Sequence, residues 1–127
     1  LQELIDELQL HNNVFLVGLK PNPYSYFKNA VIYGMSSFSE GFPNVLLEAG
    51  IFGLTSICFD APGGTSDIIT DGENGFIVPS DDILAYQNKL IASLNKPLDK
   101  KSIISLTKKR FSSHLIINQY SSVLINL

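Results

Sequence analysis

The chain has 127 residues, a formal net charge of −3, 45% hydrophobic and 17% charged residues. This is enough for about one domain with a buried core. No basic stripe precedes the last third of the sequence, which argues against nucleic acid as a partner. The single cysteine, Cys58, lies in an apolar run and predicts a buried thiol rather than a disulfide or a metal ligand. No signal peptide and no apolar run of ~18 residues is present, so we expect a cytoplasmic protein, with peripheral membrane attachment as the alternative.

The first quarter of the sequence predicts a helix, a strand, a second helix and a second strand. Leucine and isoleucine recur at helical spacing over 1–10, which predicts an amphipathic helix. The apolar run 14–17 is typical of a buried parallel strand. A short helix is expected over 24–29, and a strand over 31–35.

The remaining elements continue the alternation. A helix is predicted over 44–52, a strand over 55–59, a short helix over 65–69 and a strand over 75–78. A longer helix follows over 81–94, with Ser80 as its expected cap. Residues 97–127 predict two further helices, the last beginning near His114. Strands alternating with helices predict an α/β fold, a Rossmann-like parallel sheet of four strands with flanking helices on both faces.

One stretch, 36–50, combines charged residues with a glycine and a proline that are typical of a turn and a helix start. It follows a predicted strand, and Gly41 permits a close backbone approach there. Pro43 suits the first position of a helix because its φ is already set. The free amides of the first helical turn, Asn44 to Leu46, would then lie at the carboxyl end of the strand, where open α/β sheets bind ligands. Such a helix start favours a phosphate.

Two carboxylates flank this helix start, and their spacing limits what they can do. Glu40 and Glu48 are separated by eight residues, which on one helix would place them ~80° and ~12 Å apart. They therefore cannot form a close acid pair on one helix face. They suit two different parts of one elongated ligand.

The stretch from Glu40 to Glu48 resembles the Glu-x7-Glu signature of retaining nucleotide-sugar glycosyltransferases of family 4, which have the two-domain GT-B fold. Flanking segments resemble the same family in the correct order: 14–18, 30–33, 63–64 and 71–79. The resemblance covers about residues 1–95. It implies the donor-binding part of an enzyme that transfers a sugar from a nucleoside diphosphate to a hydroxyl acceptor, with retention, in glycan or cell-surface polysaccharide synthesis.

The resemblance also implies roles for individual residues. Glu40 would be the catalytic-site carboxylate on the donor sugar, and Glu48 would bind the ribose hydroxyls. The implied donor-binding set is Glu40, Gly41, Phe42, Pro43, Asn44, Val45, Leu46 and Glu48. The loop with Gly18, Leu19 and Lys20 would approach the nucleotide base; alternatively Gly18 only turns the chain and Lys20 is solvated. No cofactor and no divalent metal is implied.

Part of the family pattern is missing from the sequence. The family clamps the donor diphosphate with basic residues early in its carboxyl-terminal domain, whereas before Lys89 this chain has only Lys20 and Lys28. We therefore interpret 1–127 as a single partial domain: 1–95 as the nucleotide-sugar-binding α/β core of a GT-B carboxyl-terminal domain, and 96–127 as carboxyl-terminal helices. A glycan or lipid-linked acceptor would bind through an amino-terminal domain, and the chain alone is expected to be inactive.

Other interpretations remain open at this point. The chain could be a non-catalytic module that binds a nucleotide or phosphosugar. A dehydrogenase half is disfavoured because no Gly-x-Gly-x-x-Gly follows a strand. The basic cluster 96–110 is explained by a solvated helix face, with a phosphate-rich membrane surface as the alternative.

Overall fold

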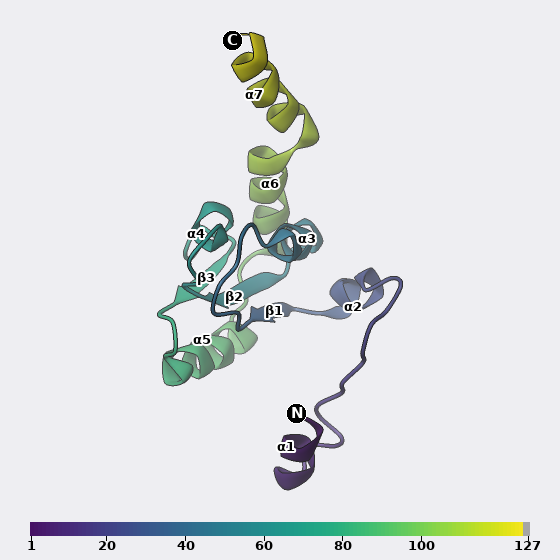
Figure 1. Ribbon diagram of the computed structural model, residues 1–127. Coiled ribbons are helices and arrows are strands. Elements are labelled where there is room, and N and C mark those ends of the chain that lie inside the picture. Colours follow the sequence, from purple (N-terminus) through teal and green to yellow (C-terminus); the bar gives the residue numbers. More distant parts are fainter. Residues whose placement is uncertain (126–127) are drawn as a thin grey trace.

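The computed structural model describes residues 1–125. At its centre lies a parallel sheet of three strands in the order β1-β2-β3, formed by β1 (Ile32–Met35), β2 (Thr55–Phe59) and β3 (Gly75–Val78) (Figure 1). Cys58 of β2 pairs with Met35 on one side and with Ile77 on the other. All five residues of β2 are buried, as expected for the central strand of a parallel sheet covered on both faces.

One face of the sheet is covered by α3 (Asn44–Phe52) and α4 (Thr65–Ile68), with α6 (Lys100–Phe111) packed against α3. The buried side chains between them are Met35, Leu46, Cys58, Ile68 and Ile69. Gly50 of α3 lies against Thr107 of α6, so closely that a Cβ on Gly50 would overlap the threonine hydroxyl. A glycine at this position therefore sets how near the two helices can approach.

The opposite face is covered by α5 (Ile83–Asn95). Because side chains alternate along a strand, Ile57 and Phe59 point to this face while Cys58 points to the other. Tyr86 of α5 lies under Gly34 of β1 and donates a hydrogen bond to the Ile57 carbonyl at 3.3 Å. The core therefore consists of two apolar layers separated by the sheet.

Three helices lie at the periphery. α1 (Gln2–Glu7) stands at the end of an extended segment apart from the sheet, and α7 (Ser113–Ile125) leads away from it beyond α6 (Figure 1). α2 (Tyr24–Asn29) is attached to α3 by aromatic contacts: Tyr24 stacks on Phe52 with ring centroids 5.7 Å apart.

The predicted α/β fold is confirmed, with helices on both faces, but the sheet has three parallel strands rather than four. The expected strand 14–17 is absent, and the side chains of this run are 40–70% exposed. A strand needs a neighbour for its backbone hydrogen bonds, and the described sheet ends at β1 without pairing to this segment. The cap of α5 also differs: Asp82 accepts from the Ala85 amide, while the Ser80 hydroxyl donates to the Asp60 carbonyl.

Candidate functional site

The loop that follows β1 is hydrogen-bonded to the loop that follows β2. The Glu40 amide donates to the Pro62 carbonyl at 3.1 Å, and the Gly64 amide donates to the Gly41 carbonyl at 2.6 Å. Gly63 has a φ of 116°, and a Cβ there would overlap the Glu40 carbonyl oxygen. Parallel strands bring their carboxyl ends to the same sheet edge, which is why these two loops meet.

The amino terminus of α3 directly follows the first of these two loops. The helix has no side-chain cap and no acidic residue in its first turn. The amides of Asn44 and Val45 have no protein partner within residues 1–125, whereas the Leu46 amide donates to the Pro43 carbonyl at 2.9 Å. The uncapped positive end of the helix dipole therefore remains available to an anion.

The predicted donor-binding residues differ in how far their side chains are exposed. Leu46 is 1% exposed, so its side chain belongs to the core. Phe42 is 48% exposed and packs edge-on against Phe111 of α6, with ring centroids 6.4 Å apart. Glu40 and Glu48 are both partly exposed. Their carboxylates can therefore meet a ligand at the surface.

The charges of both motif carboxylates influence the Tyr33 side chain of β1. Its pKa is raised, first by burial of the hydroxyl and then by the negative charges of Glu40 and Glu48. Tyr33 itself packs against the buried cluster on the α3 face of the sheet. Sequence reasoning did not single out Tyr33, although its alternation with Met35 along β1 places it on this face.

The predicted base loop is not brought to the motif. Gly18 has a φ of 63° and Leu19 is fully exposed, in the extended segment between α1 and α2 (Figure 1). A role for Gly18, Leu19 and Lys20 in base binding stays a prediction.

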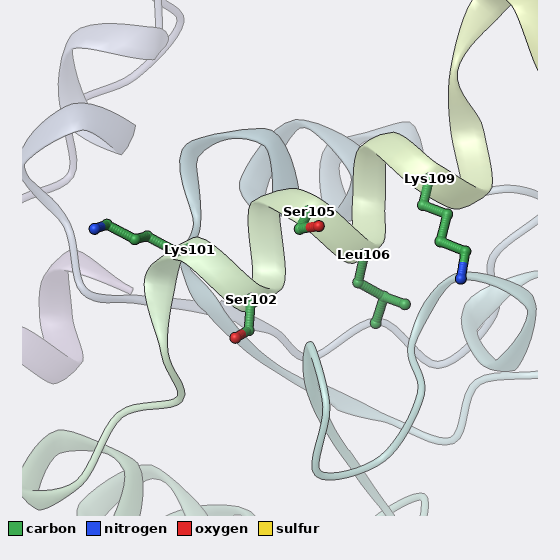
Figure 2. A pocket seen from close by; sticks show the side chains of 5 residues that line it. All are labelled: Lys101, Ser102, Ser105, Leu106 and Lys109. Atoms are coloured by element: carbon green, nitrogen blue, oxygen red, sulfur yellow. The ribbon is translucent and has the colours of Figure 1, made fainter.

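Two surface hollows flank α6, each of about 460 Å³. One opens beside the motif and is lined by Phe42, Leu47, Phe111, Ile116, Gln119 and Tyr120. The other is an open hollow along the outer surface of α6, which Figure 2 shows with the side chains of Lys101, Ser102, Ser105, Leu106 and Lys109. None of its lining residues is a predicted site residue. The sheet edge, rather than this hollow, unites the predicted groups.

The part of the chain that the structure describes holds no group of three or more His, Cys, Asp or Glu side chains arranged for a metal ion. Over the same residues, no helix combines the length and apolar character needed to cross a membrane.

Comparison with known proteins decides the family. Residues 1–110 match the family model described as Glycosyl transferases group 1. The chain belongs to this family. This group 1 chain is 30% identical over 107 residues to a Campylobacter jejuni N-acetylgalactosamine-N,N'-diacetylbacillosaminyl-diphospho-undecaprenol 4-alpha-N-acetylgalactosaminyltransferase, covering 84% of the chain and 28% of the relative. It is also 30% identical to the Staphylococcus aureus capsular polysaccharide biosynthesis glycosyltransferase CapM, over 87% of the chain and 30% of that protein.

Solved structures bear out the architecture of the group 1 chain. Anabaena HepE in complex with UDP superposes with a TM-score of 0.87 at 21% identity, over 99% of the chain and 36% of HepE. TarM superposes with a TM-score of 0.82 at 23% identity, over 95% of the chain and 25% of TarM. At such identities the likeness shows the fold alone, which is that of GT-B glycosyltransferases. The group 1 chain spans little more than a third of these proteins at most.

Proposed function

We propose that this chain is the donor-binding part of a retaining family 4 glycosyltransferase, which transfers a sugar from a nucleoside-diphosphate sugar to a hydroxyl acceptor in glycan or cell-surface polysaccharide synthesis. The observation that carries this proposal is the uncapped amino terminus of α3, placed between Glu40 and Glu48 at the carboxyl edge of the sheet. Two relatives support the proposal. HepE has been solved with UDP and with UDP-glucose, and CapM is named for capsular polysaccharide biosynthesis.

The proposed roles follow from the chemistry of each group. The amides at the start of α3 stabilise negative charge that grows on the diphosphate as it leaves the sugar. The Glu48 carboxylate accepts hydrogen bonds from the ribose hydroxyls, and the Glu40 carboxylate accepts them from hydroxyls of the donor sugar. Because a helix terminus supplies the positive end, the proposal needs no divalent metal.

The acceptor side of the reaction involves more protein than this chain. The Campylobacter relative has a name that specifies a diphospho-undecaprenol substrate, which supports a lipid-linked acceptor here, with a glycan as the alternative. We expect acceptor contacts outside residues 1–127 and sugar transfer only by the full-length protein. The chain by itself would bind the donor without turnover.

The test separates the two glutamates in the full-length protein. Titration calorimetry with UDP, GDP and ADP first identifies the nucleotide. If Glu48 binds ribose, Glu48→Ala weakens binding of the bare nucleoside diphosphate and of the sugar nucleotide equally, by about 1 to 3 kcal/mol. Glu40→Ala leaves nucleoside diphosphate affinity nearly unchanged but lowers kcat/KM for transfer by about 10- to 200-fold. Glu73→Ala, in an exposed turn, is the matched control and changes neither value.

Three results would contradict the proposal. Equal loss of nucleoside diphosphate affinity in both glutamate variants, or loss in neither, overturns the division of roles. If the carboxylates only favour the positive end of a helix, both changes lower the free energy of unfolding by up to ~1 kcal/mol and neither distinguishes ligands. Tight nucleotide binding by the full-length protein without any sugar transfer, to lipid-linked or glycan acceptors, would indicate a non-catalytic binding module.

A further inference from the structure

Arg110, near the carboxyl end of α6, is hydrogen-bonded to the end of α4 and to Thr70 just after it. Its guanidinium donates to the Asp67 carbonyl at 2.5 Å, to the Ile68 carbonyl at 3.0 Å and to the Thr70 hydroxyl at 2.8 Å. The acceptors lie about 40 residues earlier in the chain, at the end of α4. The three other lysine or arginine side chains nearest to it in sequence, Lys101, Lys108 and Lys109, are exposed.

These three bonds fix a very short helix. α4 has only four residues, and its last carbonyls lack partners within the helix. A guanidinium at this end satisfies two of them and complements the negative end of the helix dipole. Since α4 begins directly after Gly64, which bonds to Gly41, fixing α4 also fixes the loop that holds the motif.

Phe111, the next residue, reaches the motif loop itself. Its ring packs edge-on against Phe42, with a centroid distance of 6.4 Å and an interplanar angle of 64°. The Arg110 guanidinium lies over the same Phe111 ring at 4.9 Å. Arg110 holds Phe111 in place in this way, because a cation is attracted to the face of an aromatic ring.

Two consecutive residues of α6 thus contact both sides of the candidate site: Arg110 contacts α4 and Thr70, which follow the loop after β2, and Phe111 contacts the loop after β1. We propose that Arg110 and Phe111 are positioning residues for donor binding, which hold the loop pair in the geometry that receives the donor diphosphate. This inference rests on the function proposed above. Neither residue is assigned contact with the donor.

The shape of the arginine side chain is essential to this role. Arg110 uses two of its terminal nitrogens on three acceptors, whereas a lysine offers one ammonium group that cannot span the same set. Arg110→Lys keeps the charge and the ring contact but loses the fork. It therefore separates a need for positive charge from a need for the bidentate geometry.

The experiment uses the full-length protein with the variants Arg110→Met, Arg110→Lys and Phe111→Leu. Lys109→Met is the control, because this neighbouring side chain is exposed. Four quantities are measured: the melting temperature, the affinity for the nucleoside diphosphate that the wild type binds, KM for the sugar nucleotide, and kcat. Hydrogen exchange of the amides in 40–46 and 61–70 is followed in parallel.

We expect Arg110→Met and Phe111→Leu to raise KM for the donor and to weaken nucleoside diphosphate binding by about 3- to 10-fold at temperatures well below melting. Amide exchange should become faster in 61–70 for Arg110→Met and in 40–46 for Phe111→Leu. Arg110→Lys should lie between the wild type and Arg110→Met. Lys109→Met should match the wild type in every measurement.

A lower melting temperature with unchanged KM, affinity and exchange in both loops would show that Arg110 and Phe111 only stabilise α6, and would overturn the positioning role. If Arg110→Lys matches the wild type in donor KM, nucleotide affinity and amide exchange, the two-nitrogen geometry of the guanidinium is not needed. If the wild type binds none of UDP, GDP and ADP, the proposed function fails and the positioning role fails with it. If the wild type binds one of them and the variants bind it equally well, only the positioning role fails.

Discussion

A Cβ atom on Gly63 would overlap the carbonyl oxygen of Glu40, although the two residues are 23 positions apart in the chain and belong to loops that follow different strands. This close approach lets the Glu40 amide reach Pro62 and the Gly64 amide reach Gly41. The position of the Glu40 backbone is therefore set by the second loop as much as by its own.

Substitution of Gly63 tests this dependence, and Gly72 provides a matched control. Both glycines have a positive φ, 116° and 78°, but a Cβ on Gly72 would meet nothing within 4 Å. Gly72→Ala should lower the free energy of unfolding by about 1 to 2 kcal/mol through backbone strain alone. Gly63→Ala should lower it by a further ~1 to 3 kcal/mol, because the loop carrying Glu40 must also shift. Urea denaturation measures both, and equal losses would show that the contact with Glu40 is unimportant.

The close contact between α3 and α6 leads to a second prediction, on the stability of a Gly50 variant. A Cβ on Gly50 would overlap the Thr107 side chain, whose hydroxyl is already committed to the Ile103 carbonyl at 2.9 Å. Gly50→Ala should therefore lower the free energy of unfolding by about 1 to 3 kcal/mol, even though alanine favours a helix more than glycine does.

A double-mutant cycle isolates the cause of this loss. Thr107→Ala removes the overlapping atoms, so Gly50→Ala should be less harmful in that background, with a coupling of about 0.5 to 3 kcal/mol. Additive losses in denaturant unfolding would mean that some other contact limits the approach of the two helices.

The buried thiol predicts how stability depends on pH. Burial, and after it the negative charges of Asp60 and Asp71, raises the pKa of Cys58 from about 9 to about 12. A group whose pKa is higher in the folded state adds stability that is complete below its unfolded pKa and is lost as the pH rises toward the folded value. We therefore expect the free energy of unfolding to fall above about pH 9.

The share that belongs to Cys58 can be measured with Cys58→Ala. Between pH 8 and 9.5, below the range in which tyrosines ionise, the wild type should lose more stability than the variant does. A thiol-specific reagent at pH 8 should label Cys58 only after urea unfolding. Rapid labelling of the folded protein would contradict the burial, and parallel pH profiles would contradict the pKa.

The sequence predicted most element boundaries well because the signals were local. Helix Asn44–Phe52 and strand Thr55–Phe59 have the predicted bounds, since Gly53 ends the helix with a φ of 73° and an apolar run follows it directly. Pro43 likewise lies at the start of α3, although as the non-helical N-cap rather than as the expected first helical residue. In each case the decisive residue lies within or beside the element that it delimits.

Other features were decided only by tertiary neighbours. The apolar run 14–17 has the composition of a strand, yet it is exposed and unpaired within the described sheet, because a strand exists only where another supplies its hydrogen bonds. Ser80 was a good candidate cap by sequence, but the Asp60 carbonyl binds its hydroxyl and Asp82 caps the helix instead.

The features of the candidate site also fall into those that the sequence determined and those that depend on tertiary contacts. The sequence by itself determined the Glu40 to Glu48 motif, Gly41 within it and its place at the carboxyl end of a strand, because spacing and element order fix these. Only the tertiary structure decided that the charges of both carboxylates raise the pKa of Tyr33, that Arg110 contacts the end of α4 and that Phe111 contacts the loop after β1. No local period specifies a contact across 40 or more residues. Such contacts depend on the packing of α6 against α3, which forms only when the whole core is assembled.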